Sequence, residues 1–131
     1  MKLLLDTCTF LWLGAQPERL SPNARTVLAD ADNELFLSPV SLWEILVCHM
    51  RGKKLPLKVP DSPEHYFSAL RQRMGVESLS VTENTVIQLP RLPAVHQDPF
   101  DRLLICQAIE HGMTLVTPDA HISRYPIRAL W

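Results

Sequence analysis

The chain has 131 residues, a length that suits a single domain with one hydrophobic core. Its 47% hydrophobic and 21% charged residues are ordinary values for a soluble globular protein. The formal net charge of −1 excludes a whole-protein basic field for nucleic acid, so any nucleic-acid binding must depend on a local patch or on metal ions.

The sequence predicts a cytoplasmic protein that does not enter membranes. Its apolar start, Met1–Leu5, ends at Asp6, well short of a signal-peptide core. No stretch approaches the roughly 20 apolar residues of a membrane span. The odd number of cysteines matches no zinc-binding spacing and favours reduced, partly buried thiols. Cys8 follows Asp6 closely enough to line a site there, and the other two are Cys48 and Cys106.

Apolar runs and capping residues predict the elements of the first half of the chain. The continuous apolar run Lys2–Leu5 is typical of a strand buried on both faces. Asp6 then caps a short helix that Gly14 is expected to close. Ser21-Pro22 and Ser38-Pro39 each place a capping side chain before a proline in the first helical position. The predicted elements are strands at 2–5 and 35–37, helices at 7–13, 22–32 and 39–50, and a loop at 55–62.

The second half is predicted in the same way. A helix over Asp101–His111 has one apolar face and Gly112 at its end. Residues 90–99 contain three prolines and are expected to form a loop without a regular element. The other predicted elements are helices at 63–74 and 82–89 and strands at 76–81, 113–117 and 127–130.

This alternation of strands and helices predicts the α/β class. We expect one domain over residues 1–131, built as three α/β/α layers around a mostly parallel central sheet of four to five strands. Its crossover connections are expected to be right-handed.

Four acidic residues lie at or close to junctions between predicted strands and helices: Asp6, Glu44, Asp101 and Asp119. The carboxyl ends of parallel strands meet at one edge of a sheet, where such folds bind ligands. Carboxylates gathered there repel each other unless protons or cations neutralise them. Oxygen ligands favour Mg²⁺ and Mn²⁺, so the pattern predicts a metal site. One or two such ions would activate water for in-line attack on a phosphodiester.

Each of these residues also has an ordinary structural explanation. Asp6 and Asp101 can cap the helices that follow them, and Asp119 can be a turn residue. Glu44 has apolar neighbours, so its charge either reaches the sheet edge or lies exposed on a narrow polar face. The recurrence of acidic residues at successive strand–helix junctions favours the shared site.

The densest polar stretch of the chain runs from His96 to Arg102. Asp98 precedes a proline and is either a turn residue or an auxiliary of the acidic site. His96 is either a hydrogen-bonded surface histidine or a ligand. Arg102 can neutralise a carboxylate, bind phosphate or lie on the surface of a helix without a specific role. Thr117, just before Asp119, can hydrogen-bond a carboxylate or a metal-bound water.

The sequence resembles the PIN-domain ribonucleases, in particular the toxin subunits of VapBC-type toxin–antitoxin pairs. The matching segments occur in the family's order and spacing and span essentially the full chain. They are LLLDTCTFLW at 3–12, LSPVSLWEI at 37–45, HQDPFDRLLICQA at 96–108 and LVTPD at 115–119. The resemblance implies a PIN-like α/β/α fold, Mg²⁺- or Mn²⁺-dependent cleavage of RNA, and inhibition by a cognate antitoxin.

Carried over residue by residue, the resemblance assigns roles within the site. Asp6 and Asp101 would be direct metal ligands, and Glu44 and Asp119 would complete the site directly or through water. Asp98 belongs to the DPFDR variant of the motif and would assist.

Two surface features are candidate contacts for partners. A basic cluster is either solvated or contacts RNA phosphates or an acidic antitoxin segment. The apolar first helix, with parts of the next three helices, is expected to form a groove for an amphipathic antitoxin segment or a homodimer surface. The basic residues are Arg51, Lys53, Lys54 and Lys58, and the apolar ones are Phe10, Leu11, Trp12 and Leu13.

Two other functions compete with the nuclease. Phosphatases of the haloacid dehalogenase type also open with a strand ending in aspartate, but they need a second aspartate two residues on, where this chain has Cys8. A non-catalytic PIN-fold binding or scaffold protein is the main alternative, and the intact acidic quartet argues against it.

Overall fold

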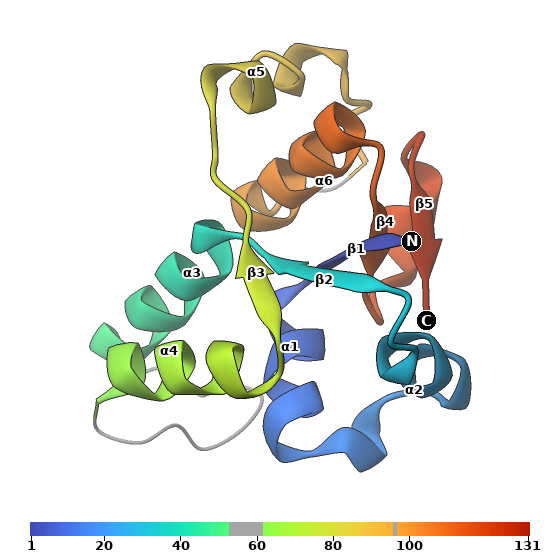
Figure 1. Cartoon of the computed structure of the whole chain (residues 1–131). Coiled ribbons are helices and arrows are strands. Elements are labelled where there is room, and N and C mark those ends of the chain that lie inside the picture. The colour runs from blue at the N-terminus through green and yellow to red at the C-terminus, as the bar shows by residue number, and fades with distance from the viewer. Residues whose placement is uncertain (53–61, 96) are drawn as a thin grey trace.

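The computed structural model of the protein describes residues 1–52, 62–95 and 97–131. Its strands are β1 (Lys2–Leu5), β2 (Glu34–Leu37), β3 (Val76–Ser78), β4 (Thr114–Val116) and β5 (Arg128–Leu130). Across these described ranges the five strands form one sheet in the order β3-β2-β1-β4-β5, and every pairing is parallel (Figure 1). The first strand in the chain is therefore the central strand of the sheet.

Helices cover both faces of the sheet (Figure 1). They are α1 (Thr7–Ala15), α2 (Pro22–Ala29), α3 (Pro39–Met50), α4 (Pro63–Arg73), α5 (Glu83–Val86) and α6 (Pro99–His111). Three short 3₁₀ turns accompany them, η1 (Pro17–Arg19), η2 (Leu89–Arg91) and η3 (Ala120–Arg124). Helices α1 to α4 pack on one face, and α5, α6 and η3 lie on the other.

The alternation of side chains along the strands creates two cores. Leu3 and Leu5 pack into the core beneath α1 to α4, whereas Leu4 packs into the core beneath α6. All three leucines are fully buried, and each contributes about 1.5–3 kcal/mol of hydrophobic free energy. The predicted α/β class and its three layers are thus confirmed, with a sheet of five strands that is wholly parallel in the described residues. None of the described helices is long and apolar enough to cross a membrane.

Gly14 does not close the first helix as predicted, because α1 continues to Ala15. A Cβ atom at this position would lie 2.2 Å from Cδ1 of Leu70. Gly14 is therefore a packing glycine that lets α1 and α4 approach closely. Gly112, in contrast, ends α6 as predicted, with the left-handed φ of 62° that favours glycine.

The predicted start of α6 at Asp101 is wrong by two residues. The helix begins at Pro99, and Asp98 caps it by accepting a hydrogen bond from the Phe100 N–H at 2.9 Å. Asp98-Pro99 therefore acts like Ser21-Pro22 and Ser38-Pro39, with a capping side chain before proline. Asp101 lies in the first turn of the helix.

Three other predicted boundaries shift for local reasons. The helix expected to reach residue 32 ends at Ala29, because the Asp30 side chain accepts from the N–H of Asp32 and makes a turn. The strand expected at 76–81 ends at Ser78, after which the Gln107 side chain donates to the carbonyls of residues 79 and 80. The predicted helix 82–89 is shorter, and η2 occupies part of the predicted loop 90–99.

Some predicted features fall on residues 53–61 and 96, outside the described part of the chain. They are most of the loop 55–62, the basic residues Lys53, Lys54 and Lys58, and His96.

Candidate active site

The carboxyl ends of β1 and β4 open into an acidic pocket of about 300 Å³. Among the described residues, five of its eight lining side chains are carboxylic acids and none is lysine or arginine. The lining residues are Asp6, Thr7, Cys8, Glu44, Asp98, Asp101, Pro118 and Asp119. The structure thus brings together all four acidic residues of the predicted quartet, and Asp98 with them.

Asp6 lies at the end of the central strand and is 7% exposed. Its Oδ1 accepts from the backbone N–H of Thr9 at 2.8 Å, which caps α1. Its Oδ2 accepts from the hydroxyl of Thr117 at 2.6 Å. Burial raises the pKa of Asp6, its hydrogen bonds with Thr117 and Thr9 oppose that rise, and the charge of Asp119 adds to it.

Two threonines attach this carboxylate to β4. Thr117 donates to Asp6 and also accepts from the backbone N–H of Asp119 at 3.1 Å. The Thr9 hydroxyl donates to the carbonyl of Val116 at 2.9 Å. The predicted hydrogen bond of Thr117 to a carboxylate is therefore confirmed, and Thr9 is a supporting residue that the sequence reasoning missed.

Glu44 reaches the pocket from α3 and does not lie on an exposed polar face. The Thr7 hydroxyl hydrogen-bonds its carboxylate. Burial is the largest cause that raises the pKa of Glu44, and the nearby charges of Asp98 and Asp6 raise it further. The carboxylates of three different elements therefore act on each other across the pocket.

The other carboxylates come from the start of α6 and from the loop after β4. Asp98 and Asp101 lie at the N-terminal end of α6, where the helix dipole favours negative charge. Asp119 caps η3 by accepting from the N–H of His121 at 2.9 Å. The capping role predicted as the alternative for Asp6 is confirmed and coexists with a place in the pocket. The capping role predicted for Asp101 is wrong, because Asp98 caps α6. Asp119, predicted as a turn residue, is a cap.

The pKa of Cys8 reflects the burial and the negative charge of the pocket. Burial raises the pKa of its thiol to about 12, and the charges of Asp6, Glu44 and Asp101 contribute to that rise. Arg19 opposes the shift. The pocket therefore disfavours further negative charge and favours a cation.

The donor chemistry of the pocket fits a hard divalent ion, because its ligands are carboxylate oxygens. In the part of the chain that the structure describes, however, no group of three or more His, Cys, Asp or Glu side chains already stands close enough to hold a metal ion. The carboxylates share one cavity without converging on a single point. Ion binding would therefore require their side chains to move inward.

Arg102 does not line the acidic pocket. Its charge lowers the pKa of Cys106, on the following turn of α6, against the dominant effect of burial. Its Nε atom is buried and has no hydrogen-bond partner among the described residues.

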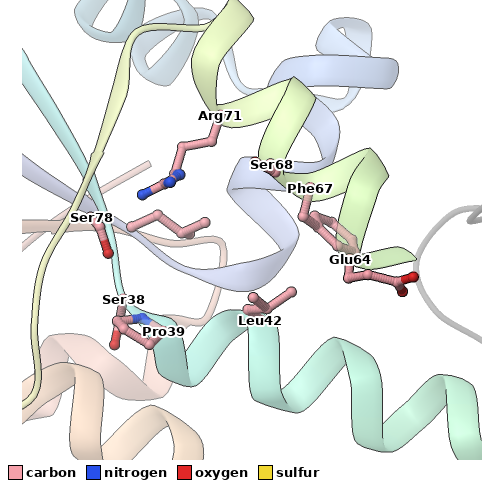
Figure 2. A pocket seen from close by; sticks show the side chains of 9 residues that line it. Ser38, Pro39, Leu42, Glu64, Phe67, Ser68, Arg71 and Ser78 are labelled. Carbon is pink, nitrogen blue, oxygen red and sulfur yellow. The ribbon is translucent and has the colours of Figure 1, made fainter. Parts of the chain in front are cut away.

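The groove was predicted from the first helix together with parts of the next three, and its first-helix part is wrong for Phe10 and Leu11, which are fully buried in the core. A cleft of about 240 Å³ lies between α3 and α4, the third and fourth helices of that prediction (Figure 2). Leu42 and Phe67 contribute apolar side chains to it.

Comparison with known proteins identifies the family. A model of the PIN domain matches residues 3–127, so the chain belongs to the PIN-domain family. It is 33% identical to Ribonuclease VapC22 of Mycobacterium tuberculosis over 122 residues, which are 92% of this chain and 88% of that protein. The predicted resemblance to VapC-type PIN domains is thereby confirmed.

Solved structures share the fold at lower identity. VapBC2 from Rickettsia felis, bound to a DNA fragment from its promoter, aligns with a TM-score of 0.70 and 15% identity over 99% of this chain and 98% of that chain. DNA-bound VapBC from Salmonella typhimurium aligns with a TM-score of 0.67 and 18% identity over 99% of this chain and 97% of that chain. These similarities support the fold assignment.

Proposed function

We propose that the protein is a metal-dependent endoribonuclease and the toxin of a toxin–antitoxin pair. One observation carries the proposal: five carboxylic acids line a single pocket at the carboxyl edge of the sheet, in a chain of the PIN-domain family. The relative VapC22, named a ribonuclease, supports RNA as the substrate.

In this proposal Asp6, Glu44, Asp101 and Asp119 hold Mg²⁺ or Mn²⁺, with Asp6 and Asp101 as direct ligands. The bound ion supplies charge neutralisation and Lewis acidity for hydrolysis of a phosphodiester by water. The chain itself positions the ligands: Thr117 and Thr9 hold Asp6 at the end of β1, and Thr7 holds Glu44. Asp98 adds negative charge beside Glu44.

We also propose the partners of the protein. The structural neighbours from Rickettsia and Salmonella are VapBC complexes, which supports a cognate antitoxin for this chain. We propose that an amphipathic antitoxin segment binds in the cleft between α3 and α4. Leu42 and Phe67 line this cleft, and the charged side chains of Arg71 and Glu64 lie at its opposite ends (Figure 2). We propose further that residues 1–131 form one PIN domain that acts in the cytoplasm as a homodimer.

The test is RNA cleavage by purified protein with Mg²⁺ or Mn²⁺, compared with the Asp6→Asn variant. We expect the variant to lose cleavage and toxicity while its circular dichroism spectrum stays that of the parent. Full cleavage by Asp6→Asn at saturating Mg²⁺ would show that Asp6 does not have the proposed role.

A non-catalytic PIN-fold binding or scaffold protein is the second candidate. It is favoured by the finding that the described carboxylates do not converge on a common ligand position. Calorimetric titration with Mn²⁺ separates the two functions. Heat of binding together with RNA cleavage supports the nuclease, whereas neither signal from the pure protein supports the scaffold.

A further inference from the structure

Trp43 of α3 is 60% exposed, although tryptophan is usually largely buried. Its ring centroid lies 5.6 Å from that of Phe100 of α6, and the two ring planes are nearly perpendicular, at 84°. Because the rings meet edge to face, they do not stack on each other. The exposure of Trp43 shows that much of its indole surface remains open to solvent.

This aromatic pair, Trp43 and Phe100, does not line the acidic pocket, but each residue is next in sequence to one that does. Trp43 immediately precedes Glu44, and Phe100 immediately precedes Asp101. Both of these acidic neighbours line the pocket. The N–H of Phe100 donates to Asp98, a third lining residue, at 2.9 Å. The pair therefore joins α3 and α6 where both helices contribute carboxylates.

A polyanionic substrate needs attraction that does not depend on basic side chains at this place. The chain has a net charge of −1, and the described lining of the pocket contains carboxylic acids without lysine or arginine. Stacking of nucleobases on aromatic rings needs no positive charge. It also tolerates any base, because every base has a π face.

We propose that Trp43, supported by Phe100, is a stacking platform for a nucleobase of single-stranded RNA next to the phosphodiester held at the acidic pocket. The proposal rests on the function proposed above and adds a substrate-binding residue to it. Trp43 contributes its open indole surface, and the perpendicular contact with Phe100 restrains the orientation of the indole.

The chain offers a matched control on the same helix. Met50 is 83% exposed and lies seven residues after Trp43, which places it on the same face of α3 about 10 Å further along the axis. If this face only bound a protein, including a second copy of the chain, truncating Met50 would matter as well. If Trp43 stacks on RNA beside the pocket, only truncating Trp43 weakens RNA binding.

The experiment measures binding of a fluorescently labelled short oligouridylate by anisotropy in Ca²⁺, and its cleavage in Mn²⁺. We expect Trp43→Ala to weaken binding by roughly 5- to 150-fold, the loss of one base–aromatic stack. Trp43→Phe restores most of the affinity, and Met50→Ala binds like the parent. Replacing single nucleotides by abasic ones should identify one position where the parent loses affinity and Trp43→Ala loses nothing further.

The outcomes separate this inference from the proposed function. Unchanged binding by Trp43→Ala, equal losses in Met50→Ala, or a changed oligomeric state of Trp43→Ala in sedimentation would each overturn the stacking platform. A parent protein that binds RNA through Trp43 but does not cleave it would overturn the nuclease and leave the platform standing. If the parent neither binds nor cleaves RNA, both are wrong.

Discussion

Thr117→Val tests whether the pocket depends on the hydroxyl that holds Asp6. The O–H···O contact of 2.6 Å is short, as expected for a bond to an ionised carboxylate, and both side chains are buried. Valine keeps the shape of threonine but leaves a buried carboxylate oxygen without its donor. A hydrogen bond to a charged group contributes about 1.5–3 kcal/mol, so we expect a loss of about 2 kcal/mol in the free energy of unfolding. For 131 residues this corresponds to a fall in Tm of about 7 °C.

The effect should depend on pH with a definite sign. The Thr117 bond lowers the pKa of Asp6, so it stabilises the ionised form. Its contribution is present above the pKa of Asp6 and is lost as the pH falls through that pKa. The difference in Tm between parent and variant should therefore be large at neutral pH and shrink in acid.

The assays are thermal unfolding at several pH values and cleavage as a function of Mn²⁺ concentration. Partners that orient metal ligands typically change metal affinity or activity by about 10- to 100-fold, so the variant should need that much more Mn²⁺. Thr117→Ser is the matched control, because it keeps the hydroxyl and loses only a methyl group. The reasoning is refuted if Thr117→Val unfolds like the parent at neutral pH, or if the serine variant is damaged equally.

Three further predictions follow from the same geometry. Asp6→Asn should raise Tm at pH 7 and above, because burial raises the pKa of Asp6 and so makes its ionised form unfavourable in the folded protein. The stability that Asp6 contributes is fully present below its ordinary pKa of 3.8 and is lost as the pH rises through the raised pKa; a lower Tm of the variant at neutral pH would contradict this. Burial, and after it the charges of Asp6, Glu44 and Asp101, raise the pKa of Cys8 to about 12 against an ordinary 9.0, so its thiolate fraction at pH 8 should be about 1000-fold below that of a free thiol and its reaction with iodoacetamide much slower. Mn²⁺ should speed the reaction by neutralising the carboxylates, and mass spectrometry of the alkylated peptide measures both rates; labelling without metal at the rate of a free thiol would contradict the raised pKa, and no acceleration by Mn²⁺ would show that the carboxylates do not act on the thiol. Gly14→Ala should destabilise the protein by about 1–3 kcal/mol in denaturant unfolding, since its Cβ would collide with Leu70, and Leu70→Ala should remove that penalty; a stabilising Gly14→Ala would mean that α4 moves away without cost.

The sequence was enough to predict the central part of the pocket, which is Asp6 at the carboxyl end of a buried strand. Lys2–Leu5 predicts a buried strand, and a strand buried on both faces in an α/β chain has its carboxyl end at the ligand-binding edge. The position of Asp6 follows from that reasoning alone. Whether Glu44 reached the same edge depended on the rotation and tilt of α3, which no local pattern specifies. Its neighbours in sequence left both orientations open, and only packing of the helix against the sheet decides between them.

The supporting bonds could be predicted only in part. Thr117 was a candidate because it stands two residues before Asp119, but its partner Asp6 is 111 residues away. Thr9 has an ordinary place in a helix, and its bond to the Val116 carbonyl exists only because β1 and β4 are neighbours in the sheet. The metal-binding role of the quartet is still a prediction.

The same long-range bonds affect when the pocket can form during synthesis. Chains fold from the N-terminus as they leave the ribosome, and β1 emerges long before β4 has been translated. Until β4 and the loop after it are available, Asp6 lacks both its hydroxyl partner Thr117 and its acidic neighbour Asp119. A nascent chain therefore carries an unfinished pocket until β4 and the loop after it have been translated.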